Sequence, residues 1–238
     1  MRAVLDLPRG RGRRAQPPHP VRQVRGRAGM TMTKSKWTLL VVLFAAGLLA
    51  DQWSKFLAVE RLTVIFQRAG QQTLGEKLVG FYSEHRHLES QATEPYVVWA
   101  PVWRMSYVEN PGAAWGMFRG FSERVRNVFF TLVSLSAGVF IVGYYRKLRE
   151  DQRFLQVALA LVLAGALGNF VDRLARGYVI DFIEWYWWNR PDLRWPTFNI
   201  ADSLIVVGVL MLVLHPGPQK GEAKKPAPDA AAGEERRA

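Results

Sequence analysis

The sequence contains no cysteine in its 238 residues. This absence excludes disulfides, thiolate metal sites and a cysteine nucleophile, and it leaves the redox compartment undetermined. Neither an HExxH pair nor a GxSxG turn occurs, which argues against a zinc protease and against a serine nucleophile of the elbow type. If the chain is a hydrolase, carboxylates remain as the side chains to consider, and we expect neither a metal nor a cofactor.

Acidic residues are nearly absent from the first 36 positions. That stretch holds ten Lys or Arg against the single acid Asp6, so nine of the twelve net positive charges lie in it. It is rich in Arg, Pro and Gly and has too little apolar surface to fold, so we expect residues 1–36 to be disordered, as we do residues 216–238. Met30 and Met32 directly precede the first apolar run, and both a later translation start and a basic cytoplasmic tail fit this pattern. Because the charge is not spread over a folded face, nucleic-acid binding explains it poorly.

Long apolar runs make up much of the remaining chain. They cover about residues 37–58, 125–145, 154–172 and 200–214, the last of which is short. Roughly 20 apolar residues span a hydrocarbon core of about 30 Å, so the pattern predicts four transmembrane helices. No small-residue cleavage site follows the first run, which argues against a cleaved signal peptide. The membrane domain is therefore predicted to cover residues 37–215.

The flanking charges predict the orientation of these helices. Lys and Arg gather before the first run, in the link 146–153 and after the fourth run, which places both termini in the cytoplasm. Residues 59–124 and 173–198 then lie outside; within the first of them, 62–66 and 96–107 resemble short strands or interfacial pieces. The tryptophans of 185–195 fit an aromatic belt better than a ligand site. The expected fold is an all-α membrane protein with a small β element, formed by an extracytoplasmic strand-containing cradle with an interfacial helix.

Three acidic residues are predicted to share one depth at the outer face. Asp172 follows Asn169, and Asp202 follows Asn199, each at a spacing that puts acid and amide on one helical face. Asp181 stands alone in the apolar, strand-like run 177–183. An ionisable group at the membrane centre costs roughly 2.5 to 3.5 kcal/mol, so such groups usually face a protein interior and serve a function.

Two interpretations of these acids are open. In one, Asp172 pairs with Arg173 or Arg176, while Asp181 and Asp202 merely cap helices, a dipole effect of about 0.3 to 1 kcal/mol. In the other, two of the acids form a dyad, because like charges a few ångströms apart in a poorly solvated pocket cannot both ionise. One acid then keeps its proton and the other activates a water molecule, without a metal or a covalent intermediate.

Further polar residues lie near the same face. Asp51 and Lys55 have the i, i+4 spacing of an ion pair, and either also suits a polar lipid head group. Asn110 suits a hydrogen bond to a substrate backbone, or equally a turn before Pro111. Gly112 and the small residues after it permit close backbone approach.

Four blocks in order resemble the signature blocks of the signal peptidase II family: DQWSK (51–55), VENPGAAWG (108–116), GNFVDRLARGYVIDFIE (168–184) and FNIAD (198–202). The resemblance covers about residues 37–215. It implies an intramembrane aspartic peptidase of the bacterial inner membrane, active at the periplasmic face. Such enzymes cut prolipoproteins before a diacylglyceryl-modified cysteine, and globomycin-type cyclic peptides inhibit them. The implied partners are these substrates and membrane lipids.

The resemblance also implies roles for single residues. It makes Asp181 and Asp202 the catalytic pair, places Asp51 and Asn110 along the substrate or lipid site, and assigns supporting roles to Asn169, Asp172, Arg173 and Asn199. Two departures from the family pattern are the Arg-rich start and the long segment 59–105. The alternative from another functional class is a small transporter with a proton or cation path. Two features make it less attractive: the sequence has no inverted repeat, and the acids gather at one face.

Overall fold

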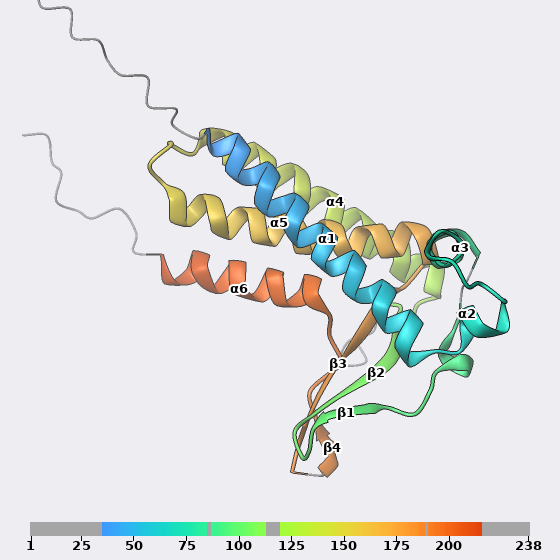
Figure 1. The fold of residues 1–238 in the computed structure, drawn as a ribbon. Helices are drawn as coiled ribbons and strands as arrows, with labels where there is room; N and C mark the ends of the chain where they lie inside the picture. Colours follow the sequence, from blue (N-terminus) through green and yellow to red (C-terminus); the bar gives the residue numbers. More distant parts are fainter. Residues whose placement is uncertain (1–34, 85–86, 113–119, 189, 216–238) are drawn as a thin grey trace, which may run out of the picture. The chain divides into compact units, whose positions relative to one another are not determined.

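The computed structural model describes residues 35–84, 87–112, 120–188 and 190–215 (Figure 1). Its main helices are α1 (Lys36–Leu62), α4 (Glu123–Lys147), α5 (Arg153–Arg176) and α6 (Ile200–Leu214). The first three are long and apolar enough to cross a membrane, whereas α6 is apolar but has only 15 residues. All four apolar runs are therefore helical, as predicted. The terminal tails, apart from Ser35 and Lys36, and the positions 113–116 of the second block lie outside the described residues.

Helix α5 is the centre of the helical part and packs against α1, α4 and α6. Its contact with α6 depends on small residues: Gly165 faces the backbone of Ala201, and Gly208 of α6 faces the backbone of Ala158. A Cβ atom at Gly168 would come within 2.5 Å of Asp51 Oδ2 on α1. Small side chains allow helices to approach closely where no water drives their association, so this glycine-lined packing fits helices in lipid.

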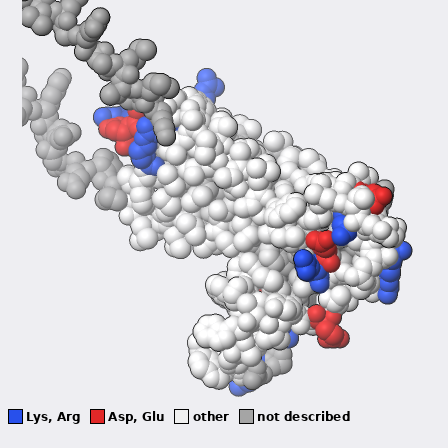
Figure 2. Space-filling model, viewed as in Figure 1, with Lys and Arg blue, Asp and Glu red and all other residues white. Residues whose placement is uncertain are grey.

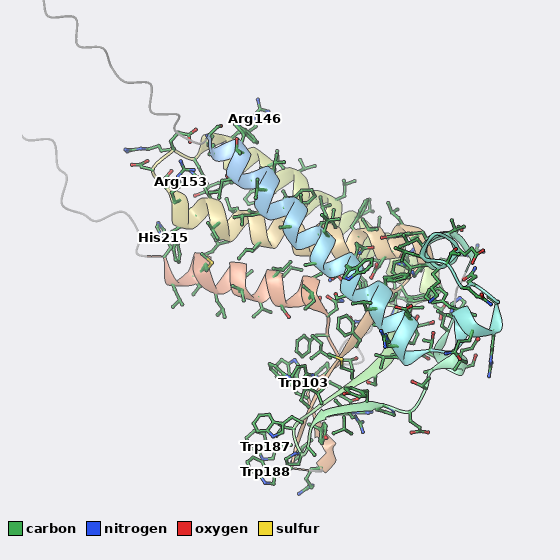
Figure 3. The ribbon with its side chains drawn as sticks, in the orientation of Figure 1. Trp103, Arg146, Arg153, Trp187, Trp188 and His215 are labelled. Carbon is green, nitrogen blue, oxygen red and sulfur yellow. The ribbon has the colours of Figure 1, made fainter. Side chains whose placement is uncertain are left out.

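At one end of the helices, side chains form hydrogen bonds with backbone carbonyls of neighbouring segments. Lys36 Nζ donates to the carbonyl of Arg146 at 3.0 Å, and the Tyr145 hydroxyl donates to the carbonyl of Lys36 at 2.6 Å. Figure 3 shows Arg146, Arg153 and His215 at this end. Trp103 and Trp187 lie far from it on strands, and Trp188 lies beside them in the turn after β3. On the face seen in Figure 2, charged side chains lie at the ends of the helices, with an uncharged band between them.

The strands form one antiparallel sheet in the order β1-β2-β3-β4. Their bounds are Tyr96–Trp99, Trp103–Asn110, Val179–Trp187 and Arg190–Arg194. β2 and β3 pair Trp103 with Trp185 and Val108 with Asp181, with a register shift between. The strands predicted in 96–107 and 177–183 are thus confirmed, as is the small β element in a mostly helical chain.

The long segment after α1 is folded rather than extended. It contains α2 (Ile65–Arg68), α3 (Leu74–Val79), the π-helical turn η1 (Gly80–Glu84) and the 3₁₀ turn η2 (Glu89–Gln91). A strand at 62–66 is wrong: α1 continues through Leu62, and α2 begins at Ile65. The physical reason is the spacing of the buried side chains Leu62, Ile65 and Phe66, which matches a helical face.

Candidate active site

The site lies where β3 and the start of α6 meet near the C-terminal end of α5. Gly177, with φ of 88°, ends α5 in the left-handed conformation and turns the chain into β3. The amides of Phe182 and Ile183 both donate to the carbonyl of Phe198, at 3.1 and 2.9 Å. This bridge fixes the first turn of α6 against β3, so that Asp202 of α6 comes close to Asp181 of β3.

Both of these acids are held by neutral side-chain amides. Asp181 accepts hydrogen bonds from Asn199 Nδ2 at 2.7 Å and from Asn110 Nδ2 at 2.9 Å. Asp202 Oδ1 accepts one from Asn169 Nδ2 at 2.8 Å. Amides orient the carboxyl groups without neutralising them, which suits acids that must exchange a proton.

The neighbours of Asn110 fix its direction. The backbone N–H of Gly112, whose φ is 90°, donates to Asn110 Oδ1 at 2.9 Å, and this turns the Nδ2 group toward Asp181. The turn before Pro111, one of the two alternatives that the sequence left open for Asn110, is therefore present, and the same side chain also donates to Asp181. The hydrogen bond to a substrate backbone stays a prediction.

Asp202 also caps the helix on which it lies. Asn199 Oδ1 accepts from the Asp202 N–H at 2.9 Å, and Asp202 Oδ2 accepts from the Asn199 N–H at 3.2 Å, a reciprocal capping box. The capping interpretation therefore holds for Asp202. It does not describe Asp181, which lies within β3 and accepts only from side-chain amides in the hydrogen bonds given above.

The environment of Asp181 favours its neutral form. The side chain is buried, with 1% exposed, and burial followed by the negative charge of Asp202 raises the pKa of Asp181 to about 8. At neutral pH the Asp181 carboxyl therefore keeps its proton. Two acids with different environments at one place are the arrangement expected of an acid–base pair.

A second polar group adjoins Asp181 and Asp202. We call it the ion cluster, and it consists of Asp51, Lys55, Asp172 and Arg176. Lys55 Nζ is 2.9 Å from Asp51 Oδ2 and 2.9 Å from Asp172 Oδ2, and Arg176 pairs with Asp172 at 3.0 Å. The exposed fractions are 0% for the first three residues and 5% for Arg176. Removing charges from water is expensive unless they are paired, and here each charge has an opposite partner.

This cluster is joined to the elements that carry the dyad. Asp51 Oδ1 accepts from the Ala201 N–H at 2.9 Å, and Lys55 Nζ donates to Asn169 Oδ1 at 3.0 Å. Asp51 and Lys55 form the ion pair that their spacing allowed, and both side chains are buried in the protein interior. Asp172 forms the predicted pair with Arg176, not with Arg173.

The remaining predicted residue, Arg173, lies beside the dyad. Its Nη1 donates to the carbonyl of Asn169 at 3.2 Å, and its guanidinium lies 5.3 Å from the centre of the Phe130 ring. Gln52 was missed, although its Nε2 donates to Asp51 and Asp172 at 3.1 and 3.2 Å. A polar residue next to Asp51 in an apolar helix was the available signal.

An apolar groove of about 1020 Å³ lies on the part of the sheet formed by the end of β1, the start of β2, the end of β3 and β4. Side chains alternate along a strand, so Ile183, Trp185 and Trp187 share the face of β3 that carries Asp181. The groove is lined mainly by tryptophan, and Figure 3 shows Trp103 and Trp187 on this part of the sheet. Across residues 35–84, 87–112, 120–188 and 190–215, no group of three or more His, Asp or Glu is arranged to hold a metal ion.

Comparison with known proteins identifies the family. The sequence model of the family described as Signal peptidase (SPase) II matches residues 43–216. A lipoprotein signal peptidase of Anaeromyxobacter sp. (strain Fw109-5) is 71% identical over 196 residues, 82% of this chain and 92% of that protein. One of Geobacter sulfurreducens is 46% identical over 110 residues, 46% of this chain and 66% of that protein.

The fold agrees with this result. A solved structure described as a bacterial membrane enzyme superposes with a TM-score of 0.51 at 26% sequence identity, covering 74% of this chain and 85% of that one. With three helices of membrane-spanning length, the chain is a multi-pass membrane protein. It belongs to the signal peptidase II family of peptidases.

Proposed function

We propose that the chain is an aspartic endopeptidase that removes signal peptides from prolipoproteins, cutting just before the diacylglyceryl-modified cysteine, with Asp181 and Asp202 as its catalytic pair. The observation that carries this assignment is the contrast between two kinds of aspartate at the site. Neutral amides hold Asp181 and Asp202. The other two acids, Asp51 and Asp172, both contact Lys55 and so are neutralised.

The roles within the pair follow from the two environments. Asp181 keeps its proton because its pKa is raised to about 8. Asp202 lies in the first turn of α6, near the positive end of the helix dipole, and accepts from the Asn199 N–H. Asp202 therefore takes a proton from a water molecule, which attacks the scissile carbonyl carbon. Asp181 donates a hydrogen bond to the carbonyl oxygen and, as the C–N bond breaks, passes its proton to the leaving amine. Asp202 then holds the proton taken from the water, and its return to Asp181 restores the pair.

Binding must hold the scissile bond over this pair. We place the signal helix of the substrate among α4, α5 and α6, with the diacylglyceryl chains in lipid beside the outer leaflet. Fixing both ends of the substrate converts the attack into an effectively intramolecular step. Asn110, next to the Gly112 turn, is placed to meet the substrate backbone.

We assign the orientation from the charges of the described residues. The end with Lys36, Arg146 and Arg153 is the cytoplasmic end, by the positive-inside rule, and α6 completes four spans by extending its apolar length with the adjoining chain. The dyad and the sheet then lie at the periplasmic face of a bacterial inner membrane. The sheet, with its exposed tryptophans at the level of the lipid head groups, forms the strand-containing cradle.

A gel-shift assay tests this proposal. Membranes containing the full chain are mixed with a prolipoprotein that carries or lacks the diacylglyceryl group, with globomycin as an inhibitor control. We expect the lipid-modified precursor to be shortened, the unmodified one to persist, and Asp202→Asn to abolish cleavage at normal expression. Equal cleavage of both precursors would contradict the assigned substrate, and cleavage by Asp202→Asn would contradict the dyad.

A further inference from the structure

The segment 73–84, here called the outer cap, is a folded unit within the long segment 59–105. Thr73 and Glu76 form a capping box at the start of α3, and Lys77 Nζ is 2.8 Å from Glu60 Oε1 on α1. Phe81 is 2% exposed, and its ring meets that of Phe56 on α1 edge-on at 5.6 Å. Figure 1 shows α3 beside the outer end of the helices. The outer cap is therefore docked on α1.

Two residues of the outer cap reach the ion cluster. Arg176 Nη2 donates to the Phe81 carbonyl at 3.0 Å, and its guanidinium lies 3.8 Å from the centre of the Phe81 ring, a close cation–π contact. The Tyr82 hydroxyl donates to Gln52 Oε1 at 3.2 Å. Arg176 and Gln52 in turn both donate to Asp172 Oδ1, at 3.0 and 3.2 Å. The outer cap thus orients two donors that meet on one carboxylate oxygen.

The other oxygen of Asp172 connects this contact to both catalytic acids. Asp172 Oδ2 accepts from the Ile180 N–H at 3.2 Å, and Ile180 immediately precedes Asp181 in β3. The same oxygen is 2.9 Å from Lys55 Nζ, which also donates to Asn169 Oδ1. Asn169 then donates to Asp202. A displacement of Asp172 would therefore move the strand that carries one acid and the amide that orients the other.

We infer that the outer cap is a positioning element for catalysis, in which Phe81 and Tyr82 hold Arg176 and Gln52 so that Asp172 fixes the relative placement of Asp181 and Asp202. The inference rests on the proposed function, because it assumes that these two acids do the chemistry. Phe81 and Tyr82 act through other residues, so their loss lowers the rate of the bound complex rather than substrate binding. A misplacement of about 1 Å can cost about 100-fold in rate, so a modest shift is measurable.

The test compares kcat and KM of the purified full chain in lipid nanodiscs, with a diacylglyceryl-modified prolipoprotein as substrate. Tyr82→Phe removes only the hydroxyl of a side chain that is 42% exposed, so the fold is kept. Phe81→Ala removes the ring over Arg176, and Phe81→Leu restores most of its volume. Val79→Ala, at a side chain that is 57% exposed in the same cap, is the matched control. Melting temperatures identify a range in which each variant is folded.

We expect Tyr82→Phe to lower kcat roughly threefold and Phe81→Ala roughly tenfold or more, with KM within about twofold and Phe81→Leu intermediate. Val79→Ala should match the wild type. The inference is overturned if Tyr82→Phe and every folded Phe81 variant keep the kcat of the control, or if only KM changes. Asp202→Asn, measured in parallel, separates the two claims: if it is inactive while the cap variants are normal, only the outer-cap inference fails, whereas its activity would remove the proposed dyad itself.

Discussion

At the scale of single residues, the proposed chemistry depends on which aspartates of the site have a cationic partner and which do not. Lys55 lies 2.9 Å from both Asp51 and Asp172, so each of those carboxyl groups has a cation beside it. Asp181 and Asp202 are held instead by asparagine amides, and an amide leaves the proton of a carboxyl group free to move. The four aspartates thus divide into two that pair with Lys55 and two that asparagine amides hold, and the proposed function assigns the chemistry to the second two.

The pKa of Asp181 predicts an alkaline limit to activity. Because the proposed acid must hold a proton and its pKa is raised to about 8, kcat/KM should fall tenfold per pH unit above that value. The profile is measured between pH 5 and 10 with the chain kept folded. A rate that stays level through pH 9.5 would show that the reaction does not need a protonated Asp181.

The same shift predicts how stability depends on pH. The folded state keeps the Asp181 proton up to a pH of about 8, whereas the unfolded chain loses it near the ordinary carboxyl pKa of 3.8. Between these two pH values the folded state therefore binds more protons than the unfolded chain. The contribution of this residue to stability therefore decreases as pH rises through that window. Asp181→Asn cannot ionise, and its melting temperature relative to wild type should increase from pH 5 to pH 8. An unchanged difference would contradict the raised pKa; Asp151→Asn, at an exposed acid, is the control.

Sequence reasoning predicted local pairs among these residues, such as Asp51 with Lys55, but not their long-range partners. The i, i+3 spacing predicted that Asn169 and Asp172 share a face, and both do point into the buried polar region. It could not show that Asp51 accepts from the backbone of Ala201, because that contact joins residues 150 positions apart and depends on how α1 and α6 pack. The role of Asp181 and Asp202 as the catalytic pair remains a prediction of the resemblance, which the geometry supports.

At the scale of elements, glycines set the distance between helices and so the position of the acids. Gly165 and Gly168 of α5 allow α6 and α1 to approach, and Asp202 lies one residue after Ala201, which faces both. A wider spacing between α5 and α6 would pull Asp202 from the Asn169 amide. The close contact between α5 and α6 therefore helps to place Asp202 beside Asn169.

Gly168→Ala tests this packing. The added Cβ would come within 2.5 Å of Asp51 Oδ2, and overpacking of this kind costs about 1 to 3 kcal/mol. We expect a lower melting temperature and a loss of cleavage. Gly143→Ala in α4, where an added Cβ meets nothing within 4 Å, should keep both at the wild-type level or raise stability slightly. If the two variants behave alike, close packing at Gly168 is not required.

The long helices were predictable as elements, whereas the outer cap was not. Apolar runs of about 20 residues indicate helices through composition alone, and the structure confirms helices at all four. The short α2 and α3 carry no such signal. They are stabilised by contacts with α1, which a local pattern does not contain: Lys77 of α3 pairs with Glu60, and the ring of Phe66 of α2 lies 5.8 Å from that of Phe56.

At the scale of the whole molecule, the tryptophan-rich sheet is expected to lie at the membrane interface. Trp99, Trp185, Trp187, Trp188 and Trp195 are each more than half exposed, an unusual state for the largest side chain outside an interface. Tryptophan concentrates at the head-group level of bilayers. The sheet would then lie against the outer leaflet, from which lipid-modified substrates arrive.

Because the chain has no cysteine, a single spin label can measure this placement. A nitroxide at Trp188→Cys should report a membrane depth near the head groups. This depth should lie between the depths reported by labels at two reference sites. Val139→Cys, in the middle of α4 and 69% exposed, should report the hydrocarbon core, and Arg149→Cys, in the charged link after α4, should report water. A label at position 188 as accessible to a water-soluble relaxation agent as the one at 149 would contradict interfacial placement.

The most direct test of the catalytic pair is the single-turnover cleavage rate of purified wild type, Asp181→Asn, Asp202→Asn and Asp151→Asn on one lipid-modified prolipoprotein, with folding checked by melting temperature. Removal of a general acid or base typically costs 10² to 10⁴-fold, so both dyad variants should lose at least about 100-fold while Asp151→Asn keeps the wild-type rate. A folded Asp181→Asn or Asp202→Asn that cleaves within about threefold of wild type would contradict the assignment of that residue to the chemistry.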